Sequence, residues 1–115
     1  IDKDKLYVSV YTDDDQAYKI WTEVCKVDPS HILKTYDNFW EIGKGPGGPD
    51  SEIFFDRGEK YDPEGLGEKL FFEEMENDRY VEVWNVYSHN MIVIQNWIVK
   101  IIKNYLKKIL IQEWV

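Results

Sequence analysis

A seven-residue segment rich in glycine and proline, residues 43–49, is the strongest constraint on how this chain can fold. It holds four glycines and two prolines. Proline lacks the N–H that a helix or a central strand uses, and glycine loses more backbone entropy on folding than any other residue. The flanking runs Asn38–Ile42 and Ser51–Asp56 are rich in aromatic residues and isoleucine, which favours two strands joined by an irregular loop.

The rest of the first 86 residues predicts two more strands, one helix and one surface excursion. Leu6–Tyr11 is rich in β-forming residues and Tyr80–Val86 alternates between apolar and polar side chains, so each favours a strand. Apolar residues recur at helical spacing between Asp14 and Cys25. Residues 59–78 are polar and rich in turn-forming residues, which predicts an excursion on the surface.

Short acidic segments are interpreted as helix caps. Thr12 or Asp13 can cap the amino end of the predicted helix, and acids in the first turn interact favourably with the helix dipole. The triplet Asp13–Asp15 has an alternative interpretation as a cation site, although capping already explains it. Asp28–His31 predicts a turn or a capped short helix.

Charge is uneven along the chain. The net charge of −8 argues against broad binding to nucleic-acid phosphates. Residues 1–86 hold 21 acids against 10 basic residues, whereas residues 87–115 hold one acid against four lysines. This tail lacks glycine and proline and is dense in isoleucine, which predicts one long appended helix. Its alternative interpretation is a membrane- or partner-docking element, but its apolar positions nearly encircle the helix and we expect no membrane binding.

Soft metal ligands are scarce in this chain. Cys25 is the single cysteine, and His31 and His89 are the only histidines. We therefore interpret Cys25 as a buried thiol and the two histidines as surface residues. We expect no metal site and no internal disulfide. No secretory signal segment is recognised, so we expect a cytoplasmic setting.

The most specific feature of the sequence is a set of spaced motifs. They are Asn38-Phe39-Trp40-Glu41-Ile42-Gly43, Gly45-Pro46-x-Gly48-Pro49-x-Ser51-Glu52-Ile53, Asp56-Arg57-Gly58 and Asn77-Asp78-Arg79-Tyr80-x-Glu82-x-Trp84-Asn85-Val86. They resemble the catalytic core of the alanine–tRNA ligase family, which are class II aminoacyl-tRNA synthetases. The resemblance covers residues 1–86 and implies an α+β fold, with a mainly antiparallel sheet and a packed helix. It also implies ATP-dependent activation of alanine with Mg²⁺, and transfer to tRNA(Ala).

The resemblance implies that Trp40 and Asn85 line the alanine pocket. An indole offers a flat apolar wall for a methyl group, and an asparagine offers a carbonyl and an amide for the polar end of an amino acid. The alternative for Trp40 is an ordinary core aromatic on the inward face of its strand. No residue of the chain is assigned a catalytic role.

The glycine–proline loop is interpreted as the rim of that pocket. Its two prolines remove backbone donors, which disfavours a phosphate cradle. The rim residues are Gly43, Gly45, Pro46, Gly48, Pro49 and Glu52. Glu52 and Asp56 share one strand face and are interpreted as structural or rim residues, not as an acid–base pair. The family usually has cysteine where this chain has Gly47, a difference expected to loosen the loop.

The resemblance further implies that the ATP site needs segments outside this chain. The family has an arginine upstream of residue 1, and an aspartate and a glycine-rich segment with an arginine downstream. We therefore expect an inactive remnant that binds ATP and Mg²⁺ poorly by itself. The alternatives are a non-catalytic module that binds alanine or its adenylate, and a protein that docks through its tail.

Residues 87–115 are predicted to be an out-of-frame translation, appended to a core of residues 1–86. Permissible codons for Leu110–Val115, read one base out of register, encode Asp-Thr-Gly-Met-Gly, the motif that the family has downstream. Loss of one base near Val86 explains both this match and the change of composition at that point.

Sequencing the gene tests the frame hypothesis. We expect that restoring one base near Val86 gives a reading frame that continues the family sequence through the glycine-rich motif. Third-position bases that are incompatible with the shifted frame at several codons of residues 87–115 would end the hypothesis.

Overall fold

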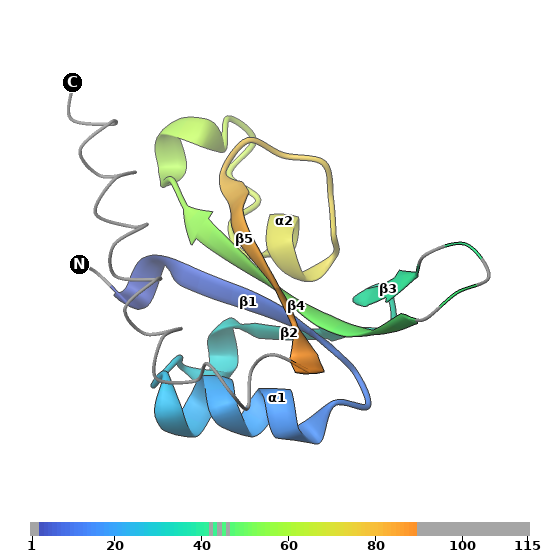
Figure 1. The fold of residues 1–115 in the computed structure, drawn as a ribbon. Helices are drawn as coiled ribbons and strands as arrows, with labels where there is room; N and C mark the ends of the chain where they lie inside the picture. Colours follow the sequence, from blue (N-terminus) through green and yellow to red (C-terminus); the bar gives the residue numbers. More distant parts are fainter. Residues whose placement is uncertain (1–2, 42, 44, 46, 90–115) are drawn as a thin grey trace.

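A computed structural model describes residues 3–41, 43, 45 and 47–89, and shows a five-stranded sheet with helices on both faces (Figure 1). The predicted tail helix falls largely in residues 90–115, outside the described residues. The strands are β1 (Leu6–Tyr11), β2 (Ile32–Thr35), β3 (Phe39–Glu41), β4 (Gly47–Asp56) and β5 (Tyr80–Tyr87). The helices are α1 (Asp15–Lys19), which continues into a π-helical segment (Ile20–Val24), and α2 (Lys69–Phe72), with single 3₁₀ turns at Lys3–Lys5, Pro29–His31 and Glu59–Tyr61.

Strand β4 is the centre of the sheet. Residues 51–55 of β4 pair with β1, and residues 47–49 of β4 pair with β3. Residues 50–56 of β4 pair with β5, which therefore lies on the edge of β4 opposite to β1. All of these pairings are antiparallel, and only β1 with β2 is parallel among the described strands. The predicted α+β class is therefore confirmed.

The glycine–proline segment was expected to be loop throughout, and this is wrong for its last three residues. Gly47, Gly48 and Pro49 extend β4 and pair with Glu41, Trp40 and Phe39 of β3. This extension lies beyond the part of β4 that pairs with β1 and β5, so Pro49 removes no hydrogen bond from the central ladder. Strand β2 was not predicted, because four residues after a turn give too short a pattern.

One face of the sheet, called here the helix face, carries the main apolar core. Trp21 is completely buried there, and its indole Nε1 donates to the hydroxyl of Ser51 at 2.9 Å. The predicted cap, Thr12 or Asp13, is wrong: the Asp14 carboxylate accepts from the backbone N–H of Ala17, so the helix begins one residue later than expected, at Asp15. Cys25 is buried as predicted. The buried residues of this core are Leu6, Val8, Val10, Ala17, Ile20, Trp21, Cys25, Val27, Ile32, Ile53, Phe55 and Val86.

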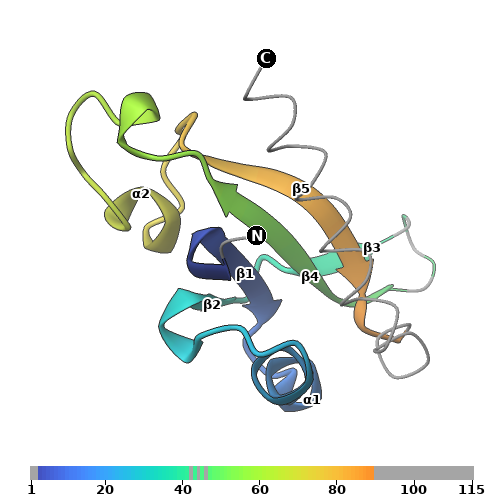
Figure 2. The same cartoon turned by 90° about the vertical axis from the view of Figure 1, so that its left-hand side faces the viewer.

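The opposite face of the sheet is covered over one half only by the described residues, and it is called here the open face. Residues 59–78 were expected to be a surface excursion, but the segment folds back so that α2 lies beside the sheet (Figure 2). Leu70 and Phe71 of α2 are buried in one cluster with Tyr7 and Tyr80. His31 also departs from the surface position expected for it. Its ring stacks on Tyr7 at 4.0 Å, and its Nδ1 lies 3.0 Å from the carbonyl oxygen of Leu6.

A β-bulge in β5 decides which side chains reach the open face. Glu82 lies opposite Phe54, but Trp84 lies opposite Ile53, so one extra residue is inserted in β5 at this point. After the bulge, Asn85 lies opposite Glu52 and shares its face of the sheet. Without the insertion the alternation would carry Asn85 to the helix face.

Arg79 ties the end of β4 to the start of β5. Its guanidinium donates to both carboxylate oxygens of Asp56, at 2.7 and 3.2 Å, and to Asp62 at 2.9 Å. Asp62 in turn accepts from the backbone N–H groups of Leu66 and Gly67 at 2.9 and 2.8 Å. The motif residues Asp56 and Arg79 therefore have a structural role: they anchor the 59–78 excursion and the start of β5.

Replacing Arg79 with alanine is expected to lower the free energy of unfolding by about 3 kcal/mol. The arginine side chain is only 14% exposed, and its loss leaves two carboxylates without their shared cation. Urea denaturation measures this. Lys69→Ala is the control, since its pair with Glu73 spans 3.9 Å and both side chains are more than half exposed. A loss for Arg79→Ala no larger than that for Lys69→Ala would contradict the anchoring role.

No helix of the described residues is long and apolar enough to span a membrane.

Candidate functional site

The open face has a floor of buried polar groups at the end that α2 does not cover. Ser9, Asn38 and Asp50 are only 3–5% exposed. The amide of Asn38 donates to the hydroxyl of Ser9 at 2.8 Å, and the backbone N–H of Asp50 donates to the carbonyl of Asn38 at 3.0 Å. Burial of polar groups costs free energy unless they are paired, so these hydrogen bonds offset the cost of burying the floor.

Trp40 forms a wall beside this floor. It lies opposite Gly48 in the β3–β4 pairing, and a Cβ on Gly48 would stand 3.3 Å from the indole Nε1. Only glycine lets the ring lie this close to the strand without displacement. The ring of Tyr87 contacts the indole with centroids 4.9 Å apart, so two aromatic rings from the two edges of β4 meet over the open face.

Asn85 reaches the same face from β5. It is opposite Glu52, and its amide Nδ2 donates to the carboxylate of Asp50 at 3.0 Å. Gly48, Asp50 and Glu52 alternate along β4 on one side, and their partners Trp40, Tyr87 and Asn85 therefore share that side. The structure thus brings Trp40 and Asn85, the two residues proposed from sequence, to one face of the sheet.

Two buried polar atoms of this site make no hydrogen bond among the described residues. They are the indole Nε1 of Trp40, a donor, and the Oδ1 of Asp50, an acceptor. Asp50 was not singled out from sequence. Its place on β4, midway between Gly48 and Glu52, was the signal that could have found it.

The rim residues are divided between several places. Gly48 and Glu52 lie on the open face, whereas Pro49 is an odd-numbered residue of β4 and lines a different hollow beside α1. Gly43 has a positive φ of 53°, and Gly45 is exposed. Pro46 is outside the described residues. The loop tip is therefore not shown beside Trp40, and the rim role of Gly43, Gly45 and Pro46 stays a prediction.

Comparison with known proteins adds an independent observation to this geometry. A family model described as class II (A) tRNA synthetases matches residues 1–109. This chain belongs to that family. It is 60% identical over 84 residues to an alanine–tRNA ligase of Streptococcus mutans, and 58% identical over 84 residues to that of Streptococcus pyogenes serotype M5. Each match covers 73% of this chain and 10% of the ligase, so the chain spans about a tenth of these relatives.

The family model reaches into the segment that we interpret as out of frame. The division at residue 86 therefore stays a prediction that the gene sequence decides.

Gly47 is a position where this class II synthetase chain has a tight backbone contact. A Cβ on Gly47 would lie 2.8 Å from the backbone oxygen of Trp40 and 3.0 Å from the ring of Phe39. A side chain at this position would push β3 away from β4. The glycine therefore permits close approach of the two strands here, and the loosening of the loop stays a prediction.

Glu52 stands between the polar floor and a second feature of the open face, a hollow of about 310 Å³ under α2. Burial, and after it the nearby carboxylates of Glu82, Asp50 and Glu74, together raise the pKa of Glu52 to about 7. An acid with this pKa exchanges its proton near neutral pH. The lining residues are Ser9, Leu33, Glu52, Phe54, Leu70, Phe71, Glu74, Met75, Glu76, Asn77 and Tyr80.

Glu52→Gln is expected to change how stability depends on pH. Because the pKa of Glu52 rises from 4.5 in the unfolded chain to about 7 in the fold, the folded state holds the extra proton between these values. The natural chain therefore loses stability as pH rises through this window. The variant should be more stable than the natural chain by about 1–2 kcal/mol at pH 8 and equal to it near pH 4.

Urea denaturation at the two pH values measures this difference. Glu59→Gln, in the exposed 59–61 turn, controls for the loss of one acid from an acidic chain. Equal stability differences at pH 4 and pH 8 for Glu52→Gln would contradict the raised pKa.

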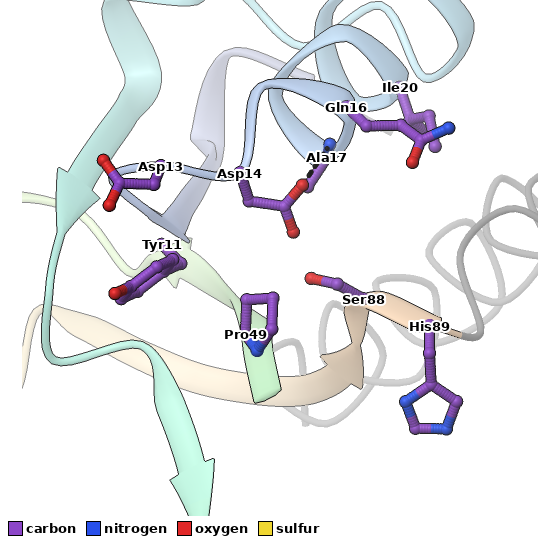
Figure 3. Close-up of a pocket in the computed structure, with 9 residues that line it drawn as sticks. All are labelled: Tyr11, Asp13, Asp14, Gln16, Ala17, Ile20, Pro49, Ser88 and His89. Atoms are coloured by element: carbon purple, nitrogen blue, oxygen red, sulfur yellow. Dashed lines mark hydrogen bonds between the residues drawn. The ribbon is translucent and has the colours of Figure 1, made fainter. Parts of the chain in front are cut away.

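Another hollow, of about 380 Å³, lies between the start of α1 and the end of β5 (Figure 3). The Asp14 carboxylate and the Ser88 hydroxyl point into it, while the His89 ring points away (Figure 3). The Oδ1 of Asp14 already caps α1 by accepting from the backbone N–H of Ala17. Among the residues that the structure describes, no three histidine, cysteine or acidic side chains gather as a metal site. Within the acidic triplet, Asp14 caps α1 and Asp15 lies in its first turn.

Proposed function

We propose that this chain carries the alanine-binding part of an alanine–tRNA ligase catalytic domain. The observation that supports this most is the placement of Trp40 and Asn85 on one face of the sheet, above a buried polar floor. The streptococcal relatives are named as alanine–tRNA ligases, and the family motifs of this chain supply both residues.

The chemistry of the face suits a small amino acid. The indole of Trp40 offers an apolar wall that a methyl group can contact, and a second ring, Tyr87, lies against it. The carboxylate of Asp50 and the amide of Asn85 lie beside each other at 3.0 Å, where a positively charged α-ammonium would be attracted. Apolar and polar parts of the site are thus separated as they are in alanine itself.

The same face is unsuited to ATP. Class II synthetases use ATP with Mg²⁺, but the open face carries the carboxylates of Asp50, Glu52 and Glu82. Negative charges on this face repel a triphosphate that Mg²⁺ does not neutralise, and the arginines that the resemblance assigns to the ATP site lie outside this chain. We therefore assign ATP, Mg²⁺ and the tRNA to parts of the whole enzyme other than these strands, and we expect this chain alone to form no alanyl adenylate.

Binding of L-alanine to the whole chain, followed by ¹H–¹⁵N NMR, tests the proposal. We expect shifts of the Trp40 indole and Asn85 amide resonances on addition of L-alanine, because both groups face the ligand. Trp40→Ala should weaken binding at least tenfold, about 1.4 kcal/mol, through loss of the apolar wall.

Trp84→Ala is the matched control, since Trp84 lies on the same sheet but opposite Ile53 on the helix face. L-valine should bind more weakly than L-alanine to a pocket bounded by an indole. Alanine-dependent pyrophosphate exchange should be absent. Equal loss of binding in both tryptophan variants, or no binding to the natural chain, would count against an alanine site on the open face.

A further inference from the structure

Asn85 is placed so that its amide has only one favourable orientation. The residue is exposed on β5, where a free side-chain amide can rotate and present either its oxygen or its nitrogen to a ligand. Its Nδ2 lies 3.0 Å from the Asp50 carboxylate. An ionised carboxylate only accepts hydrogen bonds, so the NH₂ group must face Asp50 and the amide oxygen must face away from it.

Asp50 is itself held rigidly. It is 5% exposed, and its backbone N–H donates to the carbonyl of Asn38 in the polar floor. Its Oδ2 accepts from Asn85, while its Oδ1 is buried and accepts no hydrogen bond from the described residues. A buried acceptor without a partner costs free energy, and the cost is larger for a charged group. Because this oxygen is buried, the acceptor that a ligand donor can reach is the exposed amide oxygen of Asn85, which Asp50 orients.

These contacts give the site a defined polarity. The Oδ1 of Asp50 and the Oδ1 of Asn85 are both acceptors. The NH₂ group of Asn85 is already bonded to Asp50, so it is not the group that the side chain presents to a ligand. A primary ammonium carries three N–H donors and a positive charge, so it can donate to the exposed Asn85 oxygen and is attracted by the Asp50 carboxylate. A hydroxyl has a single donor, and a methyl group has none.

We propose that Asp50 is a positioning residue, which fixes the Asn85 amide with its oxygen toward the ligand and so makes this end of the site selective for a primary ammonium. The proposal rests on the alanine site proposed above, because it assigns the ligand group that Asn85 recognises. Its first part, the orientation of the amide by Asp50, stands independently of any ligand.

The first experiment measures that orientation in the ligand-free chain. In the natural protein the Asn85 side-chain NH₂ should give two well-separated ¹H resonances that exchange slowly with water, since one N–H is bonded to a buried carboxylate. In Asp50→Ala these resonances should move to the values of a free amide, with exchange at least tenfold faster. In Asp50→Asn, which keeps an acceptor, the change should be smaller.

Two controls separate positioning from a general loss of structure. The indole N–H resonance of Trp21, bonded to Ser51 in the core, reports whether each variant remains folded. Asp78→Ala removes an exposed acid at the far end of the excursion and should leave the Asn85 amide unchanged. Unchanged Asn85 resonances in a folded Asp50→Ala variant would overturn the proposal, whether or not the chain binds alanine.

The second experiment measures selectivity for the ammonium. The affinity of the chain for L-alanine is compared with that for propionate, which has the same carbon skeleton and carboxylate but no ammonium. Asp50→Ala should weaken L-alanine binding at least tenfold and leave propionate binding unaltered. The double variant Asp50→Asn with Asn85→Asp restores a carboxylate–amide pair with reversed polarity, and it should recover L-alanine binding relative to Asp50→Asn alone.

The outcomes separate this proposal from the proposed function. No L-alanine binding to the natural chain, with the Asn85 amide responding to Asp50, would reject the alanine site and leave the positioning contact standing. L-alanine binding that Asp50→Ala leaves unchanged, in a folded variant, would reject the role of Asp50 and leave the alanine site standing.

Discussion

The register of β5 on β4 is the constraint on which the rest of the site depends. Asn85 reaches the open face only because Tyr80 lies opposite Asp56 at one end and the bulge inserts one residue before Trp84. Arg79 holds that end in place through its bonds to Asp56 and Asp62. A mostly buried arginine with two carboxylates is costly to disrupt, so the anchor sets the starting point from which the side chains of β5 alternate.

Local pattern was enough to predict four of the five described strands and the first helix, but not β2, α2 or the way in which the elements come together. Leu6–Tyr11 and the helix near Asp14 follow directly from side-chain periodicity and capping chemistry. The bulge depends on a count of residues across two strands, and no single-strand pattern contains it. Residues 59–78 look polar because most of them are exposed, yet two buried side chains, Leu70 and Phe71, suffice to fold the segment onto the sheet.

In the candidate site, too, some residues could be predicted from sequence and others only from the assembled sheet. Trp40 and Asn85 were found from motifs, and their common face follows from pairings with Gly48 and Glu52 on one strand. Strand alternation puts Asp50 on the face of Gly48 and Glu52, but a lone acid in a strand is usually an exposed side chain, so its burial could not be predicted. Its importance comes from burial and from its contact with Asn85, 35 residues away in sequence, and such contacts exist only after the sheet has formed.

The bulge gives this strand an unusual sensitivity to insertions and deletions. Removal of the one extra residue would leave the ladder between β4 and β5 continuous. All side chains beyond that point would nevertheless exchange sides, with Trp84 taking the position of Asn85. Such a chain could fold and still have no amide at its binding surface, so a family that depends on this geometry is under selection on strand length as well as on residue identity.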